Sequence, residues 1–161
     1  MYKLSDACVI ETRNEQDKVV VIIRDIVSNS FVEIPPTRWA SFLLLQDNIE
    51  GAIKRLREKK DYVKYAEHFG GGGWYASVTI GSWCVDIRQF YFSNDGEVKP
   101  TKHGITLRLP EWTALQNILP LLMSFASELL MAYPCSLRED HKDPHVLSDC
   151  RECTPFEDVI A

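Results

Sequence analysis

Cations and aromatic side chains are interleaved within residues 84–106, which read CVDIRQFYFSNDGEVKPTKHGIT. Unpaired nucleic acid exposes phosphates and base faces, and a surface that combines cations with aromatic rings can bind both. One base stacked on an aromatic ring contributes about 1–3 kcal/mol. The candidate phosphate ligands are Arg88, Lys99, Lys102 and Arg108, and the candidate stacking groups are Tyr91, Phe90, Trp74 and Trp83. His103 follows Lys102 and is mostly neutral at physiological pH.

The same residues also allow a purely structural interpretation. Strict alternation along a strand places Val85, Ile87 and Tyr91 on one face, and Arg88, Phe90 and Phe92 on the other. Arg88 and Tyr91 can share a surface only if a bulge or a sharp twist lies between them. Arg88 can also pair with Asp86, a solvated contact of small energetic value. An aromatic strand more often belongs to a core than to a binding platform.

The negative charge of the chain is concentrated near its end. The 161 residues carry a net charge of −5, but the segment from Ser136 onward has seven acids and three bases. Residues 1–135 have sixteen acids and fifteen bases and are almost neutral. Local clustering of charge decides nucleic-acid binding, so an acidic total does not exclude such a ligand.

The first half of the chain predicts strands followed by a helix. Residues 7–12, 18–27 and 30–34 are rich in β-branched side chains. The motif IPPTRW then predicts a helix start, because proline suits the first helical turn. Apolar residues with helical spacing predict one buried face, made of Trp39, Phe42, Leu45, Ile49, Ala52, Ile53 and Leu56. The basic run that ends this helix, residues 54–64, is more typical of a solvated helix end than of a phosphate site.

The second half repeats this scheme. Strands are expected over residues 74–80, 83–92 and 104–109, and LPEW predicts a helix to about residue 133 with a kink at Pro120. The preceding HFGGGGW lacks the lysine and hydroxyl residue of a phosphate-binding loop, and is interpreted as a linker or hairpin loop. Internal repetition predicts two sheet-plus-helix units that pair within one chain, an α+β fold.

Particular residues correspond between the two halves. Arg24 in VIIRDI matches Arg88 in VDIRQF, and Trp39 after IPPTR matches Trp112 after LRLPE. Both tryptophans are interpreted as core anchors. The span from arginine to tryptophan is longer in the second half, so most of residues 84–106 is an insertion relative to the first half.

The segment from about residue 83 to 122 resembles the transcriptional coactivators called positive cofactor four, a single-stranded-DNA-binding family. The resemblance rests on DIR at residues 86–88, the aromatics that follow, G-x-x-KP at 96–100, KHGI at 102–105 and the PEW helix start. It implies a curved four-stranded antiparallel sheet followed by a long helix. Two such units then pair through their helices. Here either a degenerate first repeat takes the place of the second subunit in an intrachain pseudo-dimer, or two chains form a homodimer through the helices.

The resemblance also implies a function. It predicts a nuclear coactivator without enzymatic activity that binds single-stranded DNA with little sequence preference, through Arg88, Tyr91, Lys99, Lys102, His103 and Trp74. Transcription or replication proteins are further expected partners, and base stacking would serve RNA as well as DNA. This sequence departs from the family at its first hairpin, GGGGWYASVTIGSW, which carries no charge where the family has several cations. A protein-interaction scaffold that has lost DNA binding is the alternative.

The expected organisation is a first repeat over residues 1–61, a second over 62–134 and an acidic tail over 135–161, for which partial disorder is expected. The five cysteines do not form a disulfide pattern, and neither a signal peptide nor a membrane segment is expected. No cofactor or metal is expected. A zinc site made of His141, His145, Cys150 and Cys153 remains an open hypothesis, because two histidines and two cysteines can bind zinc tetrahedrally.

Overall fold

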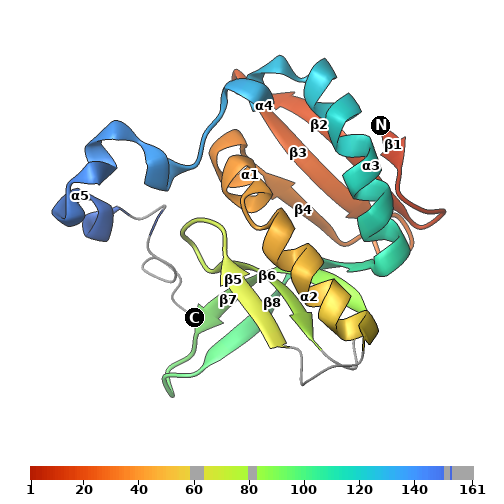
Figure 1. The fold of residues 1–161 in the computed structure, drawn as a ribbon, viewed down its shortest axis with the longest axis horizontal. Helices are drawn as coiled ribbons and strands as arrows, with labels where there is room; N and C mark the ends of the chain where they lie inside the picture. The colour runs from red at the N-terminus through yellow and green to blue at the C-terminus, as the bar shows by residue number, and fades with distance from the viewer. Residues whose placement is uncertain (59–63, 80–82, 151–152, 154–161) are drawn as a thin grey trace.

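The computed structural model describes residues 1–58, 64–79, 83–150 and 153, and contains two four-stranded antiparallel sheets (Figure 1). Sheet A consists of β1 (Tyr2–Lys3), β2 (Cys8–Glu15), β3 (Lys18–Asp25) and β4 (Phe31–Ile34), in that spatial order. Sheet B consists of β5 (Lys64–His68), β6 (Trp74–Thr79), β7 (Cys84–Phe92) and β8 (Val98–Arg108), also in chain order.

Two helices follow each sheet. The first pair is α1 (Pro36–Leu43) and α2 (Gln46–Glu58), and the second pair is α3 (Leu109–Phe125) and α4 (Ser127–Met131). The α+β class and the repetition of sheet followed by helix, both predicted from the sequence, are confirmed. Among the described helices, none has the length and apolar character needed to cross a membrane.

The apolar residues of the first helical segment form the predicted buried face. All seven, from Trp39 to Leu56, are buried. The segment is not one helix, however, because the chain turns at Leu44 and Leu45 between α1 and α2. Leu45 stays buried at this turn, and its amide donates a hydrogen bond to the carbonyl of Phe42.

Aromatic rings from both halves meet in one continuous core. The Trp39 and Phe42 rings stack with centroids 5.5 Å apart, and the Trp112 ring meets Phe42 edge-on at 6.2 Å. Both tryptophans are almost completely buried. The two corresponding helix starts therefore pack against each other through Phe42.

Polar contacts also join the helices of the two halves. The Trp112 indole N–H donates to Glu50 Oε1 at 2.8 Å, so this buried donor is satisfied. The Gln46 amide donates to Gln116 Oε1 at 2.9 Å, again between α2 and α3.

The second helical segment differs from the prediction. Helix α3 continues through Pro120 and ends at Phe125, and Ala126, with φ −118° and ψ 74°, separates it from α4. This break directs α4 back over the core, where Ala126 and Leu129 are buried.

Two strands and the order of the tail were not predicted. Strand β1 has only two residues, and β5 reads KYAEH, which lacks a β-branched run. After α4 the described chain forms two short 3-10 helices, Cys135–Leu137 and Glu139–Lys142, and then α5 (Pro144–Asp149). The expectation of partial disorder was made for the whole tail, of which residues 151–152 and 154–161 lie outside the described part.

Candidate nucleic-acid interface

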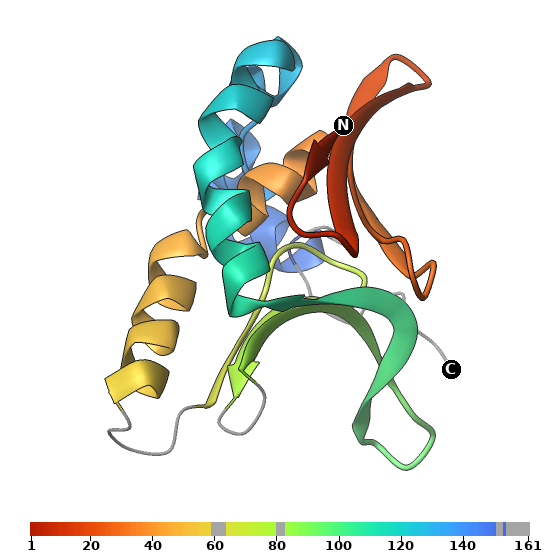
Figure 2. The ribbon, with the colours of Figure 1, turned by 90° about the vertical axis from the view of Figure 1, so that its right-hand side faces the viewer.

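Sheet B has two chemically different faces. The face toward the helices is apolar and buried, and it carries Ala76, Val78, Val85, Ile87, Ile105 and Leu107. Strand alternation and cross-strand register define the opposite face, here called the open face: Lys64, Ala66, His68, Tyr75, Ser77, Cys84, Asp86, Arg88, Phe90, Gly104, Thr106 and Arg108. Figure 2 shows sheet B bent into an arch with the helices outside it, so the open face is concave.

A bulge on β8 shapes this arch. The register runs regularly from Cys84↔Arg108 to Arg88↔Gly104 and resumes at Phe90↔Pro100, so residues 101–103 together oppose Gln89. The Thr101 hydroxyl donates to the Gln89 carbonyl at 2.8 Å and accepts from the His103 amide at 3.1 Å. The side chain of Thr101 therefore satisfies backbone groups that the interrupted ladder leaves without partners.

Arg88 lies on the open face beside the bulge and is tightly bound. Its Nε and Nη2 donate to the two carboxylate oxygens of Asp86 at 3.1 and 3.2 Å, and its Nη1 donates to the Thr101 carbonyl at 2.9 Å. The Thr106 hydroxyl also donates to Asp86. This bidentate pair fixes the guanidinium in position and offsets part of its charge.

An apolar depression lies next to Arg88. The Tyr75 and Phe90 rings meet edge-to-face with centroids 5.7 Å apart, and with Ala66, Ser77 and Val98 they enclose a cavity of about 190 Å³. Burial raises the pKa of the Tyr75 hydroxyl, so it stays protonated at neutral pH. The depression therefore offers two half-buried rings, which are a suitable surface for a planar base.

The glycine loop holds β7 at this point. The Phe90 amide donates to the Gly73 carbonyl at 2.7 Å, and the Gln89 side-chain amide donates to the Gly72 carbonyl at 2.8 Å. Gly72 and Gly73 both have φ near +80°, a conformation that glycine adopts without strain. The hairpin-loop interpretation of HFGGGGW is confirmed, because the loop joins β5 to β6.

Trp74 and His103 do not lie on the open face. With Gln89 they border a groove of about 220 Å³ against Phe31 and Glu33 of sheet A. The Arg38 guanidinium lies 5.7 Å from the Trp74 ring centroid, a cation–π contact. Trp74 therefore already packs within the junction between the halves.

The other predicted ligands lie toward the β7–β8 turn or at the bulge. Tyr91 pairs in register with Lys99, whose ammonium forms an exposed ion pair with Asp95 at 3.3 Å. Lys102 is exposed at the bulge, and Trp83 is exposed just before β7.

The structure thus distributes the predicted residues over several places. Arg88 lies on the open face, Lys102 and His103 at the bulge, and Tyr91 and Lys99 near the turn. The sequence argument missed Tyr75, and named Phe90 only as an alternative to Tyr91. Strand alternation in the uncharged hairpin could have placed Tyr75 opposite Arg88. That placement, however, requires the register between β6 and β7, which the sequence alone does not give.

The corresponding face of sheet A carries a smaller net positive charge than the open face of sheet B, because its register places Lys3, Arg13, Lys18 and Arg24 together with Glu11, Glu15 and Glu33. Arg24, the counterpart of Arg88, lies 3.6 Å from Glu11, and Arg13 pairs with Glu11 and Glu15. On the open face of sheet B, by contrast, the described cations are Lys64, Arg88 and Arg108 and the described anion is Asp86. Sheet B is therefore the more favourable surface for a polyanion.

Residues that could bind a metal lie outside this interface. Cys135, His141, Cys150 and Cys153 bring their ligand atoms within 4.8 Å of one another in the C-terminal segment. His145, which the sequence had suggested, is exposed and outside the group.

Comparison with known proteins bears on the same sheet. Residues 78–118 match the model of the family described as Transcriptional Coactivator p15 (PC4). The match includes β7, β8 and the first part of α3, and it confirms the resemblance inferred from the sequence for the second repeat. The first repeat lies outside the matched residues. Neither the curated proteins nor the solved structures gave a match.

Proposed function

We propose that this protein binds single-stranded nucleic acid, most favourably DNA, on the open face of sheet B, and acts as a nuclear transcriptional coactivator. The observation that carries the proposal is the Tyr75–Phe90 depression beside Arg88 on a concave, net basic face. The family match over β7 and β8 supports it, because that family consists of transcriptional coactivators.

Base stacking is the main contribution in this proposal. The depression accepts a base against Phe90 and Tyr75, while Arg88, held by Asp86 and Thr101, contacts the adjacent phosphate. Lys99 and Lys102 extend the cationic path beyond the bulge, His103 lies next to Lys102, and Tyr91 provides an additional ring near the turn. None of these contacts reads a base edge, so we expect little sequence preference.

The two repeats act as a pseudo-dimer in which only one sheet binds the strand. Sheet A supplies the helices α1 and α2 that pack against α3, and on its own face Arg24 and Arg13 pair with Glu11 and Glu15. Trp74 supports the junction in this arrangement and does not stack on a base.

A titration with a fluorescently labelled single-stranded oligonucleotide tests the proposal. Phe90→Ala removes one stacking ring, so we expect the affinity to fall about 5- to 150-fold, which corresponds to about 1–3 kcal/mol. Tyr133→Ala is the matched control, because Tyr133 is an exposed aromatic after α4, outside sheet B. Equal effects of the two substitutions would overturn the assigned surface.

A second pair of variants tests the phosphate contact. We expect Arg88→Ala to weaken binding and Arg24→Ala to leave it unchanged. Far-ultraviolet circular dichroism and a thermal melt of each variant show whether the fold is retained.

A protein-interaction scaffold is the second candidate function. The favouring observation is that Asp86 neutralises Arg88 and Asp95 pairs with Lys99, so two predicted phosphate ligands already have acidic partners. In that case the folded wild-type protein shows no detectable oligonucleotide binding even at low salt. Transcription or replication proteins would then be the partners to search for.

A further inference from the structure

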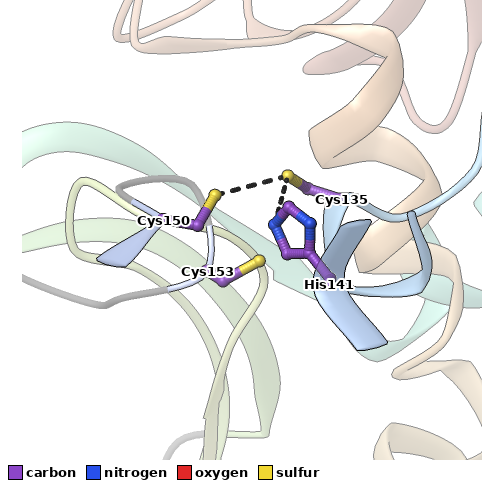
Figure 3. A group of neighbouring side chains, drawn as sticks. All are labelled: Cys135, His141, Cys150 and Cys153. Carbon is purple, nitrogen blue, oxygen red and sulfur yellow. Dashed lines mark hydrogen bonds between the residues drawn. The ribbon is translucent and has the colours of Figure 1, made fainter. Parts of the chain in front are cut away.

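We propose that Cys135, His141, Cys150 and Cys153 bind one structural zinc ion that holds the C-terminal segment in its folded form. Three thiol sulfurs and one imidazole nitrogen converge there, with all four ligand atoms within 4.8 Å of one another. Figure 3 shows the four side chains pointing toward a common centre.

The distances suit tetrahedral coordination. Zinc bonds of about 2.3 Å to sulfur and 2.0–2.1 Å to nitrogen place neighbouring ligand atoms about 3.6–3.8 Å apart in a tetrahedron. Cys135 Sγ lies 3.6 Å from His141 Nε2 and 3.6 Å from Cys150 Sγ. A disulfide requires sulfurs about 2.05 Å apart, so the pair Cys135 and Cys150 has the spacing of shared metal ligands and not that of a disulfide.

A carboxylate orients the histidine. His141 Nδ1 lies 2.8 Å from Asp140 Oδ1, so the Nδ1–H donates to the carboxylate and leaves the lone pair of Nε2 toward the three sulfurs. Metal-binding histidines generally have such a partner on the second ring nitrogen. Asp140 is therefore a positioning residue for the site.

The burial pattern of the segment gives an independent argument. Among the described residues from 135 to 150, the buried side chains are Cys135 and His141, and both belong to the cluster. Two 3-10 helices and the six-residue α5 thus surround the ligand group without an apolar core of their own. Segments too small to bury a core commonly depend on a metal for their structure.

The contact between the last two ligands and their spacing in the sequence also fit. The Cys153 amide donates to the Cys150 carbonyl at 3.2 Å, and two residues separate the cysteines, which is the short spacing of many zinc sites. The full spacing is Cys-x5-His-x8-Cys-x2-Cys, in which Cys135 takes the place that sequence reasoning had given to His145.

The site also anchors the segment to the body of the protein. Cys135 and Cys153 border a cavity of about 330 Å³ together with Leu45 and with Phe69 and Gly70 of the glycine loop. Zinc binding would therefore order the chain at this contact and fix the position of the tail beside β5.

Elemental analysis of the full chain, purified under reducing conditions without chelator, tests the proposal. We expect about one zinc per chain, with less than one tenth of that in Cys150→Ser and in His141→Ala. His145→Ala is the matched histidine control and Cys84→Ser the thiol control, and both should retain zinc. Cobalt exchanged into the wild type should give thiolate charge-transfer and tetrahedral ligand-field bands, which Cys150→Ser lacks.

Three outcomes would overturn the proposal: no stoichiometric metal, iron in place of zinc, or full zinc retention in Cys150→Ser. A thermal melt of each variant shows that the two-sheet body still folds, so loss of metal is not mistaken for global unfolding. Asp140→Ala should lower zinc affinity about 10- to 100-fold without abolishing binding, as measured by competition with a chelator. Oligonucleotide binding is measured in a separate experiment and does not test whether these four residues bind zinc.

Discussion

The most constrained side-chain position on the open face is Arg88 opposite Gly104. A methyl group built at Gly104 would lie 2.7 Å from Arg88 Cζ, 2.8 Å from Cγ and 2.9 Å from Cβ. Because the contact includes the first carbon of the arginine side chain, the guanidinium cannot simply swing away. Gly104 thus leaves room for Arg88 to reach both Asp86 and the Thr101 carbonyl.

Gly104→Ala is therefore expected to destabilise the protein by about 1–3 kcal/mol, the usual cost of overpacking. Chemical denaturation measures the effect. Gly51→Ala in α2 is the matched control, because no atom lies within 4 Å of the added methyl group. An exposed helical glycine replaced by alanine should add up to about 1 kcal/mol of stability. The same sign for both substitutions would contradict the contact between Gly104 and Arg88.

At the scale of single residues, the sequence predicted residue types but not their positions on the sheet. A bulge was expected only as the condition for Arg88 and Tyr91 to share a surface. The bulge lies at residues 101–103 of β8, opposite Gln89, and it leaves Tyr91 off the open face. Register is a long-range property of the sheet, which explains why Tyr75 and Phe90 were not recognised as the aromatic pair.

Helices were more predictable than strands. The buried face from Trp39 to Leu56 could be predicted from helical periodicity alone, because the apolar residues that define it recur at helical spacing within one segment of the chain. The turn at Leu44 and the break at Ala126 were missed, because both are set by packing on the core and neither carries a glycine or proline. Strand β5 was missed because its residues have low strand propensity and depend on pairing with β6.

At the scale of helices and strands, the contacts between α2 and α3 give a testable prediction. Glu50→Ala removes the acceptor for the Trp112 indole N–H, and Trp112 is almost completely buried. An unsatisfied buried donor costs about 1–3 kcal/mol, so we expect a loss of that size in the free energy of unfolding.

Glu50→Gln keeps an acceptor oxygen at the same place and serves as the control. It should lose much less stability than Glu50→Ala in the same denaturation experiment. If the two variants were equally unstable, the charge of Glu50 and not its hydrogen bond would be the source of the effect.

For the whole molecule, the distribution of charge predicts a modest salt dependence of oligonucleotide binding. The proposed phosphate ligands are three cations, namely Arg88, Lys99 and Lys102. Single strands release about 0.7 counterions per neutralised phosphate, so the logarithm of the binding constant should fall with the logarithm of salt with a slope of about −2.

Anisotropy titrations over a range of potassium chloride concentrations measure this slope. A value near −3.5 would mean that Lys64 and Arg108, which lie on the open face together with Arg88, contact phosphates as well, which makes five contacts. A slope near zero would contradict phosphate binding on this face. Lys18→Ala, on sheet A, should leave the slope unchanged.

The presence of both repeats in one chain affects how the protein can evolve. In a homodimer, each substitution appears at two symmetric places. Here Trp39 and Trp112 bring the two halves together, yet each is encoded separately. A mutation beside Arg24 leaves the neighbours of Arg88 unchanged, so selection can act on the two sheets separately.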